Sequence, residues 1–461
     1  MSGHDETNRG VLRMLIDNSI LLIAGATLAL IWANVAHRVG STSYHDFVHF
    51  DLTSLWPAEP DHEVGPAAPD HDAAPGHDAA PDLAVAADLP VASGPGEQDG
   101  HETHHGFTIH FLVNDIMMAF FFALAAKEVW ESLLPGGALA NPRKAATPLL
   151  ATFGGIAGPA LVYLAGAWVA GGDTLATLGR GWAVPCATDI AFSYLIARII
   201  FGNSHPAIAF LLLLAIADDA AGLLILAVFY PQAPIAPAWL LLTVGAMLLA
   251  WGLSRLKVHT HWAYLLGPGL LCWLSFYFAN IHPALGLVPI IPLLPHAQTD
   301  LGLFAREELD RSDTLSEFEH FWKTPVEIFL GLFGLVNAGV VVSSLGTGTW
   351  LVLAGLLIGK PLGITVMTLI AEKGFKLETP VGMDYRHIVT LGMVAGIGFT
   401  VALFVSVAAF PAPGPVQDSV KMGALLSFAA APLAIVMGRV LRIRPYRSVD
   451  PQETSTPAHA A

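Results

Sequence analysis

Two adjacent aspartates, Asp218 and Asp219, lie in the middle of the apolar stretch AFLLLLAIADDAAGLLILAVFY, which covers residues 209–230. One aspartate at the centre of a membrane-spanning helix costs roughly 2.5–3.5 kcal/mol on an insertion scale, so a pair costs about twice as much unless a neighbouring group compensates. Carboxylates release protons, and their oxygens bind hard cations. A site of this type can therefore hold either a proton or a cation.

Two further ionisable residues interrupt apolar stretches: Asp189 in VPCATDIAFSYL and Lys360 in AGLLIGKPLGITV. A static salt bridge would explain Lys360 with one aspartate but would leave two carboxylates uncompensated, so some of these groups must reach water, an ion or a proton. Adjacent helical residues diverge by about 100°. We therefore expect one of Asp218 and Asp219 to face the ion, and the other to face Lys360 or a water-filled opening.

The overall composition is that of a polytopic membrane protein. The 461 residues are 54% hydrophobic and 13% charged, with a mean hydropathy of +0.59. Apolar runs of near-spanning length, about 20 residues, recur along the chain. The two cysteines, Cys186 and Cys272, lie inside such runs, which indicates neither a disulfide framework nor a thiolate zinc site. The twelve predicted runs are 17–36, 108–134, 145–170, 182–200, 205–230, 237–255, 262–280, 282–296, 325–345, 348–371, 386–410 and 419–441.

The basic residues predict the orientation of these runs. When loops are assigned alternately to the two sides, seventeen Lys and Arg residues fall on one side and only Arg38, Arg180 and Lys421 on the other. The positive-inside rule then places both termini in the cytoplasm and favours an even number of spans. We expect a multi-pass protein of the inner (plasma) membrane, with a cytoplasmic N-terminus (1–16), a membrane domain (17–442) and a cytoplasmic tail (443–461).

The acidic excess behind the net charge of −15 is concentrated in an outward insertion at 51–105, between the first two runs. This segment is rich in Ala, Pro, Asp and His, as in PDHDAAPGHDAAPD, and its composition is typical of disorder. Its histidines could bind a transition metal, since imidazole and carboxylate are both ligands. We favour a solvated low-complexity insertion, because repeated His-Asp pairs without fixed geometry do not specify a site.

Two runs carry signs of broken helices. Pro185 lies three residues before Thr188, and LGMVAGIGFT places Gly396 and Gly398 in the middle of a run. Interrupted helices in corresponding halves of a chain are typical of transporter sites, although glycines also serve close helix packing. Exposed helix N-termini would favour an anion such as Asp189, and C-termini a cation such as Lys360.

Four of these motifs carry a family resemblance. ATDIAF (187–192), LAIADDAAG (214–222), LLIGKPLGI (356–364) and GIGFTVALFV (396–405) resemble, in order and spacing, the NhaA family of sodium/proton antiporters. The resemblance extends to VNDIMMAFFFALAAKEVWESLL (113–134) and NAGV (337–340). It implies an all-α fold of about twelve transmembrane helices, with inverted repeats and two broken helices that cross near mid-membrane.

The resemblance also implies residue roles. Asp218 and Asp219 correspond to the pair that binds sodium and exchanges protons, and Lys360 to a lysine that compensates Asp218 and is a candidate proton carrier. Thr188 and Asp189 correspond to the polar residues at the first helix break. Glu128, Glu319 and His320 are similar to residues of a pH-responsive cytoplasmic funnel. The chain departs from better-known members nearby, with Trp130-Glu131-Ser132 after Glu128 and with Lys323.

These observations predict a secondary transporter that exports sodium, and lithium as a further substrate, in exchange for external protons. The exchange would be electrogenic and would serve sodium and pH homeostasis. We expect no cofactor beyond the transported Na+, Li+ and H+, no nucleic-acid partner, contact with membrane lipid, and a homodimer as an open alternative. The rival interpretations are a transition-metal/proton exchanger that uses the His/Asp-rich insertion and an intramembrane aspartyl protease.

Overall fold

The computed structural model describes residues 3–55, 107–203, 205–296, 313–378, 382–443 and 445. Within these residues the secondary structure is helical, apart from one isolated bridge between Asp51 and Thr108. The α-helices are α1 (Gly3–Val39), α2 (Ser43–Val48), α3 (Ile109–Phe111), α4 (Met118–Leu133), α5 (Pro142–Ala170), α6 (Thr174–Leu178), α7 (Ile190–Phe201), α8 (Pro206–Phe229), α9 (Leu240–Arg255), α10 (His261–Tyr264), α11 (Leu270–Phe278), α12 (Thr314–Asn337), α13 (Thr347–Ala354), α14 (Lys360–Lys373), α15 (Tyr385–Ala395), α16 (Phe399–Ala409), α17 (Pro415–Leu426) and α18 (Ala430–Val440).

Seven helices in the described part of the chain are long and apolar enough to cross a membrane, and two bent helix pairs raise this number to nine. One pair joins the helical segment Thr174–Cys186 to α7 with a bend of 54°, and the other joins α15 to α16 with a bend of 52°. Spans of this kind confirm the predicted all-α polytopic membrane fold, because a polar backbone crosses lipid only when it is hydrogen-bonded internally.

Three of the twelve predicted runs do not meet this criterion for a span. The run at 262–280 corresponds to α10 and α11, which one wide helical turn (Leu265–Gly269) joins. The run at 325–345 lies largely in α12, which begins earlier and carries charged residues in its first turns. The run at 282–296 contains only two short 3₁₀ segments, Pro283–Leu285 and Val288–Leu293, because its prolines cannot continue an α-helix.

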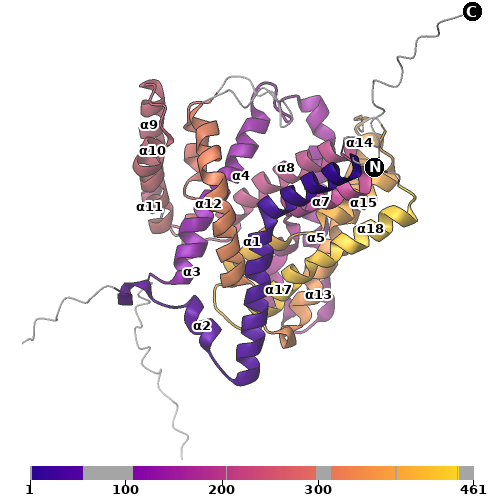
Figure 1. Ribbon diagram of the computed structural model, residues 1–461, viewed down its shortest axis with the longest axis horizontal. Helices are drawn as coiled ribbons and strands as arrows, with labels where there is room; N and C mark the ends of the chain where they lie inside the picture. The colour runs from indigo at the N-terminus through magenta and orange to yellow at the C-terminus, as the bar shows by residue number, and fades with distance from the viewer. Residues whose placement is uncertain are drawn as a thin grey trace, which may run out of the picture.

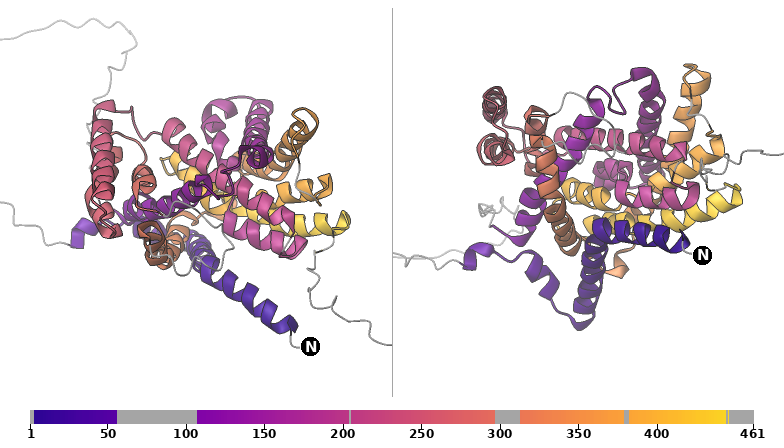
Figure 2. Two further views of the ribbon diagram at one scale, coloured as in Figure 1. Left: turned by 90° about the horizontal axis from the view of Figure 1, so that it is seen from above. Right: turned by 45° about the horizontal axis from the view of Figure 1, so that its top comes forward.

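The two bent pairs occupy equivalent places in two halves of the fold. In each half a long helix precedes the bent pair and another follows it: α5 and α8 in the first half, and α13–α14 and α17–α18 in the second. α9 and α10–α11 form a separate layer at one edge of the bundle (Figures 1 and 2). The repeat places the two breaks in the interior of the fold.

Close contact between α5 and α14 brings the lysine of α14 into this interior. A Cβ atom on Gly363 would lie 2.0 Å from the Gly154 carbonyl oxygen, so only glycine permits this approach of the two backbones. Gly158 and Gly359 repeat the contact one turn away, which is the small-xxx-small pattern of packed membrane helices. Lys360 lies in this contact and has no exposed surface.

The predicted insertion at 51–105 is described only over 51–55, and the rest lies outside the described residues. At its base, the Leu52 N–H donates to the Phe107 carbonyl (2.9 Å) and the Ile109 N–H donates to the Phe50 carbonyl (3.2 Å). The two chain segments that flank the insertion therefore lie side by side. At the N-terminus, α1 already begins at Gly3, so most of the predicted tail 1–16 continues this helix. The tail 443–461 is described only at residues 443 and 445.

Candidate functional site

The two helix breaks contact each other directly. The Asp189 N–H donates to the Ile397 carbonyl (2.7 Å), and the Thr188 hydroxyl oxygen lies 3.2 Å from the Ala395 carbonyl oxygen. Gly396 is required here, since a Cβ atom at this position would lie 2.7 Å from the carbonyl oxygen of Leu356. At the two breaks, helix ends thus hydrogen-bond to the other broken helix instead of within their own. We call the place where the two breaks meet the crossing.

Asp189 lies at the N-termini of both downstream half-helices. Its carboxylate caps α7 by accepting from the Phe192 N–H (3.4 Å). Its second oxygen accepts from the Thr400 N–H (3.3 Å) and the Thr400 hydroxyl (2.5 Å) at the start of α16. The positive ends of two helix dipoles therefore compensate one buried carboxylate. Thr400 is a site residue that the sequence analysis did not identify.

The side chain of Lys360 lies at the C-terminal end of a helical segment, where backbone carbonyls are exposed. Its ammonium donates to the carbonyl of Cys186 (2.5 Å), the last residue of the helical segment before the first break. A carbonyl end carries partial negative charge and suits a cation. The same ammonium lies 3.0 Å from Oδ2 of Asp218, with 0% of the Lys360 side chain and 2% of the Asp218 side chain exposed.

Thr188 completes the surroundings of Asp218, because its hydroxyl donates to the same oxygen, Oδ2, at 2.7 Å. Four residues of the predicted site, Thr188, Asp189, Asp218 and Lys360, therefore meet at the crossing. They come from the first break, α8 and α14, which are distant in sequence. Oxygen atoms of Thr188 and Asp218 are suitable ligands for a hard cation such as sodium.

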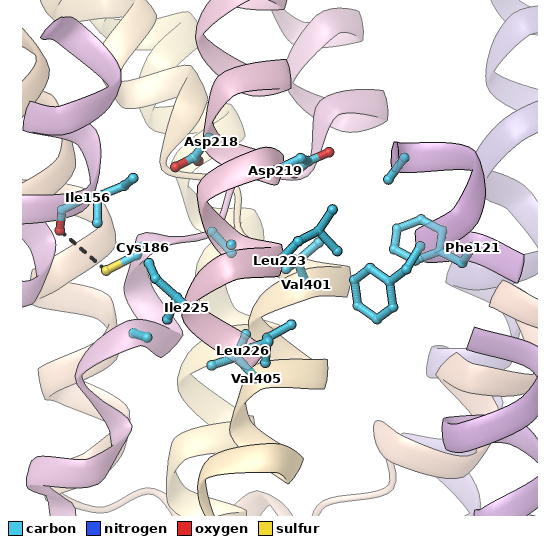
Figure 3. Close-up of a pocket in the computed structure, with 15 residues that line it drawn as sticks. Phe121, Ile156, Cys186, Asp218, Asp219, Leu223, Ile225, Leu226, Val401 and Val405 are labelled. Carbon is cyan, nitrogen blue, oxygen red and sulfur yellow. Dashed lines mark hydrogen bonds between the residues drawn. The ribbon is translucent and has the colours of Figure 1, made fainter. Parts of the chain in front are cut away.

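Asp219 points away from this cluster. Figure 3 shows the two carboxylates on opposite sides of α8, with Cys186 on the side of Asp218 and Phe121 on the side of Asp219. The Asp219 carboxylate has no hydrogen-bond or ion-pair partner among the residues that the structure describes. It lines a cavity of about 480 Å³ instead. One aspartate of the pair is thus paired with Lys360, and the other is accessible.

The large cavity extends between α4, α7, α8, α12 and α16, and its charged lining residues are Glu128, Asp189, Arg198, Asp219, Lys323 and Glu327. A second, smaller cavity of about 30 Å³ touches both Asp218 and Asp219. Apart from these aspartates, its walls are mainly apolar, with Phe121, Leu226 and Val405 among them. The aspartate pair therefore lies between a large cavity that has charged groups in its lining and an apolar closure.

The three pH-response candidates have different surroundings. Glu128 lines the large cavity with Asp219, whereas Glu319 pairs with Lys127 and His320 is exposed on α12. Lys127 also lies 2.5 Å from Glu131, so one buried ammonium holds two carboxylates. Lys127 is not among the site residues predicted from the sequence.

No group of three or more His, Cys, Asp or Glu side chains in the described residues has the geometry of a metal site. The histidines of the predicted insertion at 62, 71, 77, 101, 104 and 105 lie outside these residues. The polar groups that the structure brings together are those of the two aspartates and their neighbours.

Comparison with known proteins assigns this arrangement to a family. The family model described as Na+/H+ antiporter 1 matches residues 93–441. The chain is 46% identical over 446 residues to a Na(+)/H(+) antiporter NhaA of Jannaschia sp. (strain CCS1), covering 92% of this chain and 96% of the relative. It is 45% identical over 436 residues to the protein of that name from Geotalea uraniireducens (strain Rf4), covering 94% and 97%. A third relative, from Geobacter sulfurreducens, is 50% identical over 343 residues, covering 74% and 88%. The chain therefore belongs to the Na+/H+ antiporter 1 family, whose matching members are NhaA antiporters.

Proposed function

We propose that this chain exports cytoplasmic sodium in exchange for external protons, and that the exchange takes place at Asp218 and Asp219. Membership of the family makes the chain a secondary transporter of sodium and protons, and not an enzyme. Family membership alone does not specify which residues carry out the exchange, in which direction it runs or whether it is electrogenic.

The observation that carries the proposal is the opposite orientation of the two aspartates. Asp219 faces a cavity of about 480 Å³, whereas Asp218 is enclosed with Lys360 and Thr188. A sodium ion that arrives through the cavity meets Asp219 first and can then be shared with Asp218. Binding the cation favours the charged carboxylates and so releases protons from the pair. Protons and sodium thereby compete for the same oxygens.

Lys360 gives this competition an electrical consequence. When Asp218 turns toward sodium, Lys360 loses its carboxylate partner in a buried place, which favours loss of its own proton. The exchange then moves more proton charge than the single charge of sodium, so we propose that it is electrogenic. Lithium presents the same charge to the same oxygen ligands and is the second proposed substrate.

The apolar closure beside the pair supports alternating access. In this conformation the large cavity opens beside Arg198 and Lys323, two residues of the basic side of the chain. The positive-inside rule places this side in the cytoplasm, together with both termini. We propose that the two half-helix pairs move relative to their neighbours to close this cavity and open the apolar side.

The proposed location is the plasma (inner) membrane. Its lipid contacts are supported by the exposed apolar side chains of α9, such as Leu241, Leu248 and Trp251. The homodimer remains a prediction.

The two rival interpretations are less well supported. An aspartyl protease needs two carboxylates that share a proton across one water molecule, but Asp218 and Asp219 point to opposite sides of one helix. Transition metals favour imidazole or thiolate ligands, and the large cavity is lined by neither among the described residues, although Cys186 lines the small one.

Proton flux in proteoliposomes tests the proposal. Addition of sodium or lithium to vesicles with an imposed pH gradient should dissipate that gradient. Potassium is the control cation and should have no effect. Clamping the membrane potential at zero with valinomycin and potassium should accelerate the flux if the exchange is electrogenic. A flux that does not respond to the clamp would contradict the electrogenic step, and a flux that does not require sodium or lithium would contradict the exchange itself.

A further inference from the structure

Two histidines meet at the end of the fold where α8 begins. His205, the residue before α8, and His387, in the first turn of α15, have ring centroids 4.9 Å apart and planes inclined by 28°. His205 is buried and His387 is half-buried. α8 carries Asp218 and Asp219, and α15 is the first half of the second broken helix. The stacked pair therefore links α8, which carries the two aspartates, to α15, the first half of the second broken helix.

Each ring also caps the helix that it precedes or begins. The Ala207 N–H donates to Nδ1 of His205 (3.1 Å), and the Asp384 N–H donates to Nδ1 of His387 (3.0 Å). Nδ1 accepts a hydrogen bond only when it carries a lone pair. Both rings are therefore neutral in this arrangement, with their protons on Nε2.

A proton on either ring opposes the arrangement in three ways. It occupies Nδ1 and removes the cap of that helix. It places a positive charge at a helix N-terminus, where the helix dipole is already positive. It also places a positive charge next to the partner ring. If the partner ring is protonated as well, the two like charges repel each other. Burial, and next the charge of His387, lower the pKa of His205.

Charged groups of both signs lie near the pair. On α15, the opposite charges of Asp384 and Arg386 flank His387, and the Arg386 guanidinium lies 2.9 Å from the Asp384 carboxylate. Arg198 of α7 donates to Asn203, and Glu372 of α14 accepts from Tyr385. The last turn of α18 carries a further cation, Arg439. The hydrogen bonds to the two Nδ1 atoms and the burial of His205 are the observations that favour the neutral pair.

We propose that His205 and His387 form a pH-dependent clamp that holds α8 against α15 while both rings are neutral and releases the two helices when either ring is protonated. The two histidines are positioning residues, since neither contacts the transported ions. The proposal rests on the proposed function, because the clamp regulates exchange at Asp218 and Asp219. The exchange rate should fall as the pH drops through the range in which imidazoles become protonated, about pH 7 to 5.

A double variant that keeps the caps but cannot titrate tests the clamp. Asparagine is a favourable N-cap, so His205→Asn still accepts from Ala207, and glutamine at the third helical position completes a capping box, so His387→Gln still accepts from Asp384. The acid limb of the exchange profile in proteoliposomes should move to lower pH by about half a unit or more, with the alkaline rate retained. His259→Asn, at an exposed loop histidine between α9 and α10, is the matched control and should leave the profile unchanged.

Thermal unfolding in detergent provides a readout that does not depend on transport. Because the pKa of folded His205 is lowered, its neutral form stabilises the parent fully above about pH 6.5, and this stabilisation is lost as the pH falls below that value. The melting temperature of the parent should therefore decrease more between pH 7.5 and 5.5 than that of the double variant. Equal decreases, or an acid limb that coincides with that of the parent, would overturn the clamp. Absence of sodium-dependent flux in the parent would instead count against the proposed function.

Discussion

The ammonium of Lys360 and the carboxylate of Asp218 form an enclosed ion pair across two helices, with 3.0 Å between Nζ and Oδ2. Both groups have a second partner, since the Cys186 carbonyl accepts from Lys360 and the Thr188 hydroxyl donates to Asp218. A buried pair of this type is sensitive to the loss of one member, because the remaining charge stays buried without its partner.

Lys360→Ala should therefore destabilise the protein as well as impair exchange. Removing one partner of a buried ion pair costs about 3–5 kcal/mol, so the melting temperature in detergent should fall clearly. Combining Lys360→Ala with Asp218→Asn should recover part of the loss, because no uncompensated charge remains. Lys373→Ala, at an exposed position in the last turn of the same helix, is the control and should change stability little. A double variant no more stable than the lysine variant would argue against the pairing.

The two aspartates should differ in their tolerance of substitution. Asp218→Asn and Asp219→Asn both remove a group that can exchange a proton for sodium, so each should abolish or cripple exchange. Asp219 should be the stricter position, because its carboxylate faces the cavity while Asp218 is shared with Lys360. Sodium-induced proton flux measures the effect, with the exposed α2 carboxylate variant Asp46→Asn as the control. Exchange close to the parent value in Asp219→Asn would refute the mechanism.

Polar residues in apolar runs predicted most of the crossing, because an ionisable group in lipid is costly enough to be placed only where it is compensated. The sequence could not show which aspartate faces Lys360, since the angle of about 100° between neighbours fixes their divergence but not the rotation of the helix. Thr400 was missed because a threonine in a membrane helix commonly bonds to its own backbone, and nothing in its local sequence indicates a partner 211 residues away. The run at 282–296 was predicted from its hydropathy, which does not register that its prolines break the helix.

Thr400 should contribute to both stability and exchange. Its hydroxyl donates to buried Asp189, and a hydrogen bond to a charged group is worth about 1.5–3 kcal/mol. Thr400→Val removes the donor at nearly constant volume and should lower the melting temperature and the exchange rate together. Thr400→Ser keeps the hydroxyl and should retain most of both. If the valine variant matched the serine variant in the two measurements, the hydroxyl contact would have no role in holding the crossing.

The pH-response candidates on α12 should behave differently from each other. Glu319 pairs with buried Lys127, which joins α12 to α4, whereas His320 is exposed and makes no hydrogen bond or ion pair with the described residues. Glu319→Gln should therefore change the pH profile of exchange, because it leaves Lys127 with Glu131 alone. His320→Gln should leave the profile nearly unchanged. The prediction fails if the histidine variant shifts the profile and the glutamate variant does not.

The insertion at 51–105 should be dispensable for transport. Its flanking segments are already joined by the bridge between Asp51 and Thr108 and by the hydrogen bonds on either side of it, so the membrane domain does not need the intervening residues to bring them together. Deletion of Pro57 to Gly100 keeps the bridge and leaves residues 52–56 and 101–107 as the connection between its two partners. Exchange in vesicles should stay close to the parent value.

Any contribution of the insertion's carboxylates to local cation concentration should be confined to about 8 Å around each charge at physiological salt and should fade as salt rises. Loss of exchange in a correctly inserted deletion protein, or an effect of micromolar zinc or copper on the parent that the deletion abolishes, would show that the insertion regulates transport.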